Sequence, residues 1–216
     1  MATQKEIILT DYIRKSLEIV ASAEGFRNYD FVIDHGSSIG DGFVGVILKV
    51  KIKENDSDKK LSVLAKIPPQ NKARREQPGV LSTFEREVYV YNVLLPEVVA
   101  FQKDEKITTA QGFFNFPKVY YADFNAEIKD SIIIMEDLRD TGHRMWDKYK
   151  PIDLEHAKLL MMALGRLHAL SFAMKIKKPE QFEKFRKLQD IYGSLMNDEG
   201  TKSFLDASLQ QALSTL

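Results

Sequence analysis

Residues 44–67 contain two apolar–polar alternations joined by a polar turn, and this pattern dictates an antiparallel hairpin. Apolar residues occupy every second position of the first segment: Val44, Val46, Leu48, Val50 and Ile52. A period of two is typical of a β-strand. The turn ENDSDKK follows, and LSVLAKI (61–67) alternates again. Pro68 and Pro69 end the second strand, because proline has no N–H for the ladder.

Three further segments are predicted to be strands. FVID (31–34) precedes the first hairpin. KVYYADF (118–124) and SIIIMED (131–137) flank the polar segment FNAEIKD and predict a second hairpin.

Helical periodicity appears before and between the hairpins. Residues 4–22 place apolar side chains on one helical face. Ser82 and Glu85 have the spacing of a capping box, which predicts a helix from Ser82 towards Pro96. That helix would carry one apolar row: Phe84, Val88, Tyr91 and Leu95. Residues 97–111 are predicted to form a loop.

The rest of the chain is predicted to be helical after an irregular segment at 138–151. A long helix is expected from Asp153 to Lys175, followed by weaker helices at 179–196 and 201–214. The long helix carries a stripe formed by Leu154, Ala157, Leu160, Met161, Leu164, Leu167 and Ser171. The fold class is therefore α+β, with five strands, one helix inserted after the third strand, and helices thereafter. This is the topology of the small lobe of a kinase continuing into a helical lobe, and we place the boundary between residues 1–138 and 139–216.

Composition narrows the classes of partner. The 216 residues include 31 basic and 31 acidic side chains, so the formal net charge of zero disfavours a nucleic-acid partner. No cysteine is present, which fits a reducing compartment. No secretory leader and no apolar run of membrane-spanning length are evident, so we expect a cytoplasmic protein without a membrane partner.

Four glycines lie between two predicted strands, at Gly36, Gly40, Gly42 and Gly45. Such a turn could let backbone N–H groups approach a phosphate. The spacing matches neither standard glycine-rich phosphate motif, so taken alone it favours an ordinary turn.

Lys66 and Glu87 are the charged residues with a possible shared role. Lys66 lies among apolar neighbours on the strand after the glycines, and Glu87 follows Phe84 on the predicted helix. A carboxylate on an apolar face needs a partner, and Lys66 is the economical one. The alternatives are a solvated strand end for Lys66 and an exposed position for Glu87.

Other polar residues carry weaker signals. SIIIMEDL (131–138) could be a hinge whose backbone binds a purine edge, or any buried strand that reaches the surface. His168 could be a general base, but its place on the apolar stripe favours a packed core histidine. The remaining histidines show no metal-ligand spacing.

Six segments together resemble a known family: GDGFVGVILKVKI, VLAKIPP, FEREVYVYNVLLP, FPKVYYAD, IIIMEDL and LGRLHALSFA. Their order and spacing are similar to those of the ecdysteroid kinase-like family of arthropods, also called the CHK kinase-like family. That family is related to choline and aminoglycoside kinases. The resemblance covers roughly residues 30–175.

The resemblance implies ATP and Mg²⁺ as cofactors and a small hydroxylated molecule, such as a steroid, as substrate. It assigns a phosphate cover to Gly40, Asp41 and Gly42, with Gly45 in place of the family's serine. Lys66 would hold ATP and Glu87 would orient Lys66. The adenine-facing hinge would be formed by Met135, Glu136, Asp137 and Leu138. His168 would be structural.

The chain lacks two motifs of the family. The family's catalytic loop resembles H-G-D-x-W-x-x-N and is followed by a metal-binding segment, and residues 176–216 match neither. We therefore assign no catalytic and no metal-binding residue, and expect a truncated kinase that is inactive alone. The alternatives are a non-catalytic module that binds a nucleotide or a partner, and an unrelated metabolite-binding domain.

Overall fold

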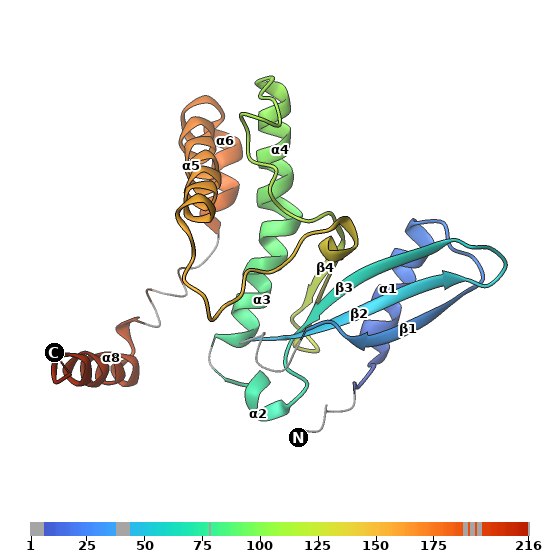
Figure 1. Ribbon diagram of the computed structural model, residues 1–216, viewed down its shortest axis with the longest axis horizontal. Helices are drawn as coiled ribbons and strands as arrows, with labels where there is room; N and C mark the ends of the chain where they lie inside the picture. Colours follow the sequence, from blue (N-terminus) through green and yellow to red (C-terminus); the bar gives the residue numbers. More distant parts are fainter. Residues whose placement is uncertain are drawn as a thin grey trace.

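The computed structural model describes residues 7–37, 44–77, 79–187, 190, 193 and 196–215, and its centre is a five-stranded antiparallel sheet (Figure 1). The strand order is β1-β2-β3-β5-β4. The strands are β1 (Tyr29–His35), β2 (Val46–Glu54), β3 (Lys60–Ile67), β4 (Val119–Asn125) and β5 (Asp130–Glu136). Both predicted hairpins, β2–β3 and β4–β5, are confirmed, as is the α+β arrangement of a kinase-like small lobe.

Helix α1 (Asp11–Ala23) covers one face of the sheet. Its buried residues include Leu17 and Val20, which pack against the alternating side chains of the central strands. Those strand residues are Leu48, Val50, Ile52, Val63, Ala65, Ile67, Ile132 and Ile134. The predicted helix at 4–22 is wrong over residues 7–10, because Thr10 caps the N-terminus by accepting a hydrogen bond from the N–H of Ile13. Residues 4–6 of that prediction lie outside the described residues.

The opposite face is partly covered by a long helical segment. It comprises α3 (Val80–Tyr89), a π-helical turn (Val90–Leu94) and α4 (Leu95–Asp104), so the predicted loop at 97–111 is wrong over its first half. Pro96 does not end the helix, because proline is tolerated in a first turn, where its N–H is not needed.

The predicted capping box at Ser82 is also wrong. The helix begins at Val80 after Gly79, which adopts a left-handed conformation with φ of 82°. The Ser82 hydroxyl donates to the carbonyl of Gly79 from inside the first turn. A short helix, α2 (Lys72–Arg75), fills the preceding segment.

The remaining helices lie away from the sheet (Figure 1). Helix α5 (Leu154–Lys177) packs against α4 through Leu170 and Met174, which contact Val98 and Phe101. Helix α6 (Pro179–Phe182) and a 3-10 turn (Glu183–Lys187) complete this group, while α8 (Glu199–Leu213) stands apart.

Candidate functional site

Lys66 and Glu87 form an ion pair, as predicted. The Nζ atom of Lys66 lies 2.5 Å from Oε2 of Glu87, and the two side chains are 27% and 29% exposed. Ala65 and Ile67 point into the core under α1, so the alternation of β3 directs Lys66 to the other face. Glu87 meets it there from α3, one turn after the buried Phe84.

The face of the sheet that carries Lys66 is apolar and only partly covered. Directly opposite residues of antiparallel strands point to the same side. The register therefore places six side chains together: Ile47, Lys49, Leu64, Lys66, Ile133 and Met135. Ile133 is buried in a cluster with Val88 of α3, whereas Ile47, Leu64 and Met135 are half-buried. Ile47, Leu64 and Met135 thus form an apolar strip that leads to the Lys66 ammonium. This arrangement suits a ligand with a flat ring joined to an anionic group.

Gly45 brings the backbone close to Ile67 and to the ring of Phe84. A Cβ atom there would lie 2.8 Å from the carbonyl oxygen of Ile67 and 2.9 Å from Cζ of Phe84. The Lys66 ammonium lies 5.6 Å from the centre of the Phe84 ring. The predicted phosphate cover at Gly40, Asp41 and Gly42 lies outside the described residues.

The segment predicted as a hinge leaves β5 and enters a 3-10 turn, η2 (Leu138–Thr141). The N–H of Glu136 donates to the carbonyl of Lys118 over 2.9 Å. The Leu138 carbonyl accepts from the Thr141 hydroxyl and from the N–H of His143. Met135 packs in the cluster beneath α3.

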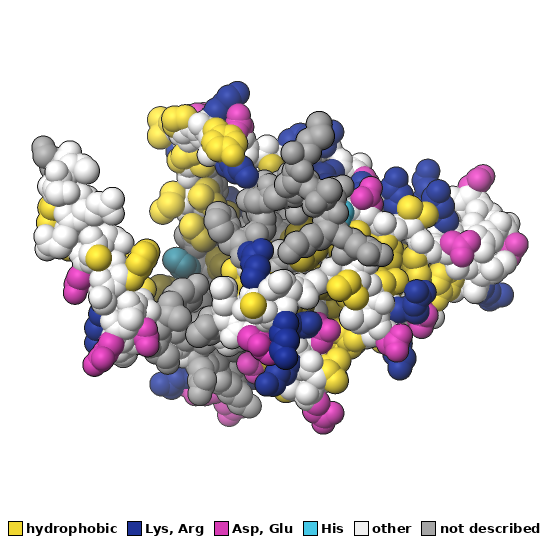
Figure 2. Space-filling model, turned by 90° about the horizontal axis from the view of Figure 1, so that it is seen from below, with side chains coloured by type: hydrophobic (Ala, Val, Ile, Leu, Met, Phe, Trp, Pro, Cys, Tyr) yellow, Lys and Arg dark blue, Asp and Glu magenta, His cyan; other side chains and the backbone are white. Residues whose placement is uncertain are grey.

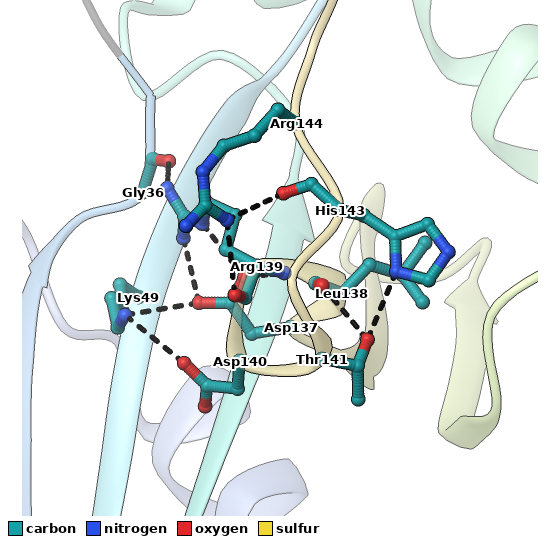
Figure 3. Close-up of polar contacts among 9 residues, drawn as sticks. All are labelled: Gly36, Lys49, Asp137, Leu138, Arg139, Asp140, Thr141, His143 and Arg144. Atoms are coloured by element: carbon teal, nitrogen blue, oxygen red, sulfur yellow. Dashed lines mark hydrogen bonds and ion pairs between the residues drawn. The ribbon is translucent and has the colours of Figure 1, made fainter.

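Sequence reasoning missed the polar cluster at this turn, which Figure 3 shows. The Asp137 side chain is fully buried, and both its oxygens contact the Arg139 guanidinium, at 2.7 and 2.8 Å. Lys49 of β2 adds a contact of 3.0 Å. These hydrogen bonds, chiefly those from Arg139, lower the pKa of Asp137 to about 2. For Lys49 the sequence did contain a signal. Its position between Leu48 and Val50 directs its side chain to the face of the sheet that carries Lys66.

Glu87 also borders an apolar groove of about 510 Å³ between α3, the π-helical turn and α5. Its walls include Val90, Tyr91, Phe113 and Leu167. Burial raises the pKa of the Tyr91 hydroxyl, and the charge of Glu87 acts in the same direction. Glu87 therefore borders the groove and also pairs with Lys66 at the end of the apolar strip.

The prediction of a packed core environment for His168 is wrong. His168 is exposed, as are Leu160, Met161 and Leu164 of the predicted stripe. The reason is that α4 contacts the other side of α5, at Leu170 and Met174. Within the described part of the chain, no group of three His, Asp or Glu side chains could hold a metal ion.

The model of the ecdysteroid kinase-like family matches residues 39–216. The chain belongs to the ecdysteroid kinase-like family. No curated protein and no solved structure matches it. Membership of the ecdysteroid kinase-like family implies a kinase-like phosphotransferase fold, and the sheet with its Lys66–Glu87 pair agrees with that fold.

Proposed function

We propose that this chain binds ATP on the half-covered face of the sheet and supplies the nucleotide-binding residues of a small-molecule hydroxyl kinase. The observation that carries the proposal is the ion pair of Lys66 and Glu87 at the end of the apolar strip. The family match supports a transferase of the kinase type. The acceptor would be a small alcohol, such as a steroid.

Each group would have a distinct role in holding the nucleotide. Lys66 would contact the phosphates, and Glu87 would keep the Lys66 ammonium in place. Gly40, Asp41 and Gly42 would cover the phosphates. The adenine ring would lie on the apolar strip, with Met135, Glu136 and Leu138 at its edge. The half-buried Leu64 and Ile47 fit the flat face of such a ring.

We propose that Mg²⁺ arrives with the phosphates of ATP, whose charge it would neutralise. The described residues supply no cluster of metal ligands, so we assign no residue to the ion. Rapid phosphoryl transfer also requires the protein to fix that ion beside the reacting phosphate. We therefore expect residues 1–216 to bind Mg-ATP without rapid turnover.

Titration calorimetry with Mg-ATP tests the proposed site. Lys66→Met keeps the length of the side chain but removes its charge, and we expect binding to weaken by about 10- to 100-fold, the usual loss for a charge-assisted hydrogen bond. Lys60→Met is the matched control, since Lys60 is exposed at the start of the same strand, about 20 Å away. Equal weakening by both changes would contradict the proposal.

A non-catalytic module that binds a nucleotide or a partner is the second candidate. The lack of a metal-ligand cluster among the described residues favours it. Incubation with Mg-ATP and a panel of steroid-like and smaller alcohols separates the two functions. Transfer that Lys66→Met abolishes would establish a kinase, whereas binding without transfer to any acceptor would favour the module.

We also propose a cytoplasmic location, no nucleic-acid or membrane partner, and a lobe boundary after Leu138. By length and composition, α5 is the one helix in the described ranges that could cross a membrane. Helix α5 packs on α4 through Leu170 and Met174, and this contact supports the proposal that no membrane partner is involved. Cell fractionation with an antibody against the chain tests the location.

A further inference from the structure

The turn after β5 is built around the buried carboxylate of Asp137. Its Oδ1 accepts a hydrogen bond from Nε of Arg139, and its Oδ2 accepts one from Nη2. The guanidinium is thus held at two points, which fixes its plane. Asp137 also accepts from the backbone N–H of Arg139 and caps η2. The side chain of Arg139 therefore has one defined direction.

The third nitrogen of Arg139 points away from the turn. Its Nη1 donates to the carbonyl of Gly36 over 2.9 Å, across 103 residues of sequence (Figure 3). Gly36 follows β1, and its own N–H donates to the carbonyl of Ile47 on β2 over 2.8 Å. Both backbone polar groups of Gly36 are thus engaged, one by β2 and one by Arg139.

Gly36 fits this position because its neighbours leave no space for a side chain. A Cβ atom would lie 2.7 Å from Cγ2 of Ile47 and 3.0 Å from the backbone carbon of Leu48. Gly36 therefore approaches β2 closely, and we expect a displacement of Gly36 to disturb the packing of β2.

Lys49 joins β2 to the same cluster. Its ammonium lies 3.0 Å from Asp137 and 3.9 Å from Asp140, and its side chain is on the face of the sheet that carries Lys66. The cluster therefore links three segments: the end of β1, the middle of β2 and the turn after β5. Two cations, Lys49 and Arg139, face two carboxylates, Asp137 and Asp140, so their formal charges cancel.

We propose that Arg139 is a positioning residue that fixes the end of β1, and through it the adjacent first half of β2, against the turn after β5. The inference rests on the proposed ATP site, since Asp137 lies between Glu136 and Leu138. A ligand that reaches from this turn along the strands towards Lys66 needs all three segments in one arrangement. A ligand that contacts only the turn does not need β1 and β2 in that arrangement.

The test compares Mg-ATP with adenosine, which lacks the phosphates. Arg139→Gln removes the charge and the two-point contact with Asp137, and we expect ATP affinity to fall about tenfold more than adenosine affinity. Arg139→Lys should recover part of the difference, because an ammonium can still reach a carboxylate or a carbonyl. Asp137→Asn releases Arg139 from the other side and should reproduce Arg139→Gln.

Arg144→Gln is the matched control. Arg144 lies beyond the same turn and donates to the carbonyls of Arg139 and His143, but Gly36 is not among its contacts. It carries the same charge change, and we expect no change in the ratio of the two affinities. Amide hydrogen exchange of Gly36 gives a second readout that needs no ligand: exchange should accelerate in Arg139→Gln and stay unchanged in Arg144→Gln.

The outcomes separate the two claims. If ATP binding depends on Lys66 but Arg139→Gln leaves both the affinity ratio and Gly36 exchange unchanged, the positioning role is wrong and the ATP site stands. A uniform loss of both affinities would also contradict positioning, since it would indicate general destabilisation. If the wild type binds neither ligand, the proposed function fails and the role of Arg139 in it fails too.

Discussion

At the scale of single residues, Asp137 shows how surroundings set the behaviour of an acid. Its side chain is shielded from solvent and contacts Arg139 and Lys49. Asp130 is also mostly buried and pairs with Arg75. In both cases a carboxylate near an end of β5 is stabilised by a cation from another segment. Each end of β5 is therefore fixed by charge as well as by packing.

Acid should remove the contribution of Asp137 to stability. Arg139 and Lys49 lower its pKa from 3.8 to about 2, so the folded state binds the proton less tightly than the unfolded state. The stabilisation is present above pH ~4 and is lost as pH falls from about 4 to about 2, by about 2 kcal/mol. Denaturant titrations across this range should show a shallower fall for Asp137→Asn. The control Asp206→Asn, at an exposed position on α8, should show the same pH dependence as the wild type. If Asp137→Asn also shows the wild-type pH dependence, the proposed contribution of Asp137 to stability is wrong.

Gly36 and Gly165 should respond in opposite ways to alanine. At Gly36 a Cβ atom would lie 2.7 Å from Ile47, so Gly36→Ala should destabilise the fold by about 1–3 kcal/mol. At Gly165, on α5, the space is open, and alanine should stabilise the helix by about 0.5–1 kcal/mol. Thermal unfolding of both variants checks the pair. Equal effects would show that the close approach of Gly36 to β2 is not tight.

At the scale of elements, Gln102 is the buried amide that holds a loop to α4. Its Nε2 donates to the carbonyl of Phe113 over 3.0 Å, and its Oε1 accepts from the N–H of Phe113 over 2.6 Å. Gln102→Leu leaves both backbone groups unpaired, and we expect a loss of about 3 kcal/mol in the free energy of unfolding. Gln111→Leu, at an exposed position, should cost less than about 1 kcal/mol. Similar losses in denaturant titrations would contradict this role of Gln102.

Much of the element order could be predicted from local pattern. The alternation in 44–52 and 61–67 fixed the first hairpin, because only one register buries Leu48, Val50 and Ile52 together. The Lys66–Glu87 pair followed from the same logic, since alternation on the strand and helical spacing from Phe84 directed both side chains to one side.

The errors share a physical cause, which is competition between local signals and long-range contacts. The predicted helix end near Pro96 is wrong, because a first-turn proline keeps the helix intact and α4 continues to Asp104. The predicted core position of His168 rests on its apolar neighbours in the sequence, but packing on α4 selects the side of α5 that carries Met174. The contacts of Arg139 with Gly36 had no local signal at all.

At the scale of the whole molecule, the sheet and the helical group differ in how well they bury their apolar residues. The sheet packs a continuous core beneath α1. Figure 2 shows hydrophobic side chains at the surface over α5, and α8 also exposes apolar residues. The largest exposed side chains of these two helices include Met161, Phe172, Ile176 and Phe204.

Charge introduced on α5 should therefore have different effects on the stability of the fold at its two sides. Met161 is 65% exposed and Met174 is fully buried. We expect Met161→Lys to leave the unfolding free energy within about 0.5 kcal/mol and to reduce concentration-dependent association, because it interrupts an exposed apolar surface. Met174→Lys should destabilise the α4–α5 contact by more than about 3 kcal/mol. Light scattering and thermal unfolding measure both effects, and reversed outcomes would contradict the packing of α5.

A crystal structure of the chain with a non-hydrolysable ATP analogue tests the central claim most directly. The account predicts the adenine ring on the strip formed by Ile47, Leu64 and Met135, with a phosphate oxygen about 3 Å from the Lys66 ammonium. An analogue bound elsewhere, with Lys66 still held only by Glu87, would contradict it.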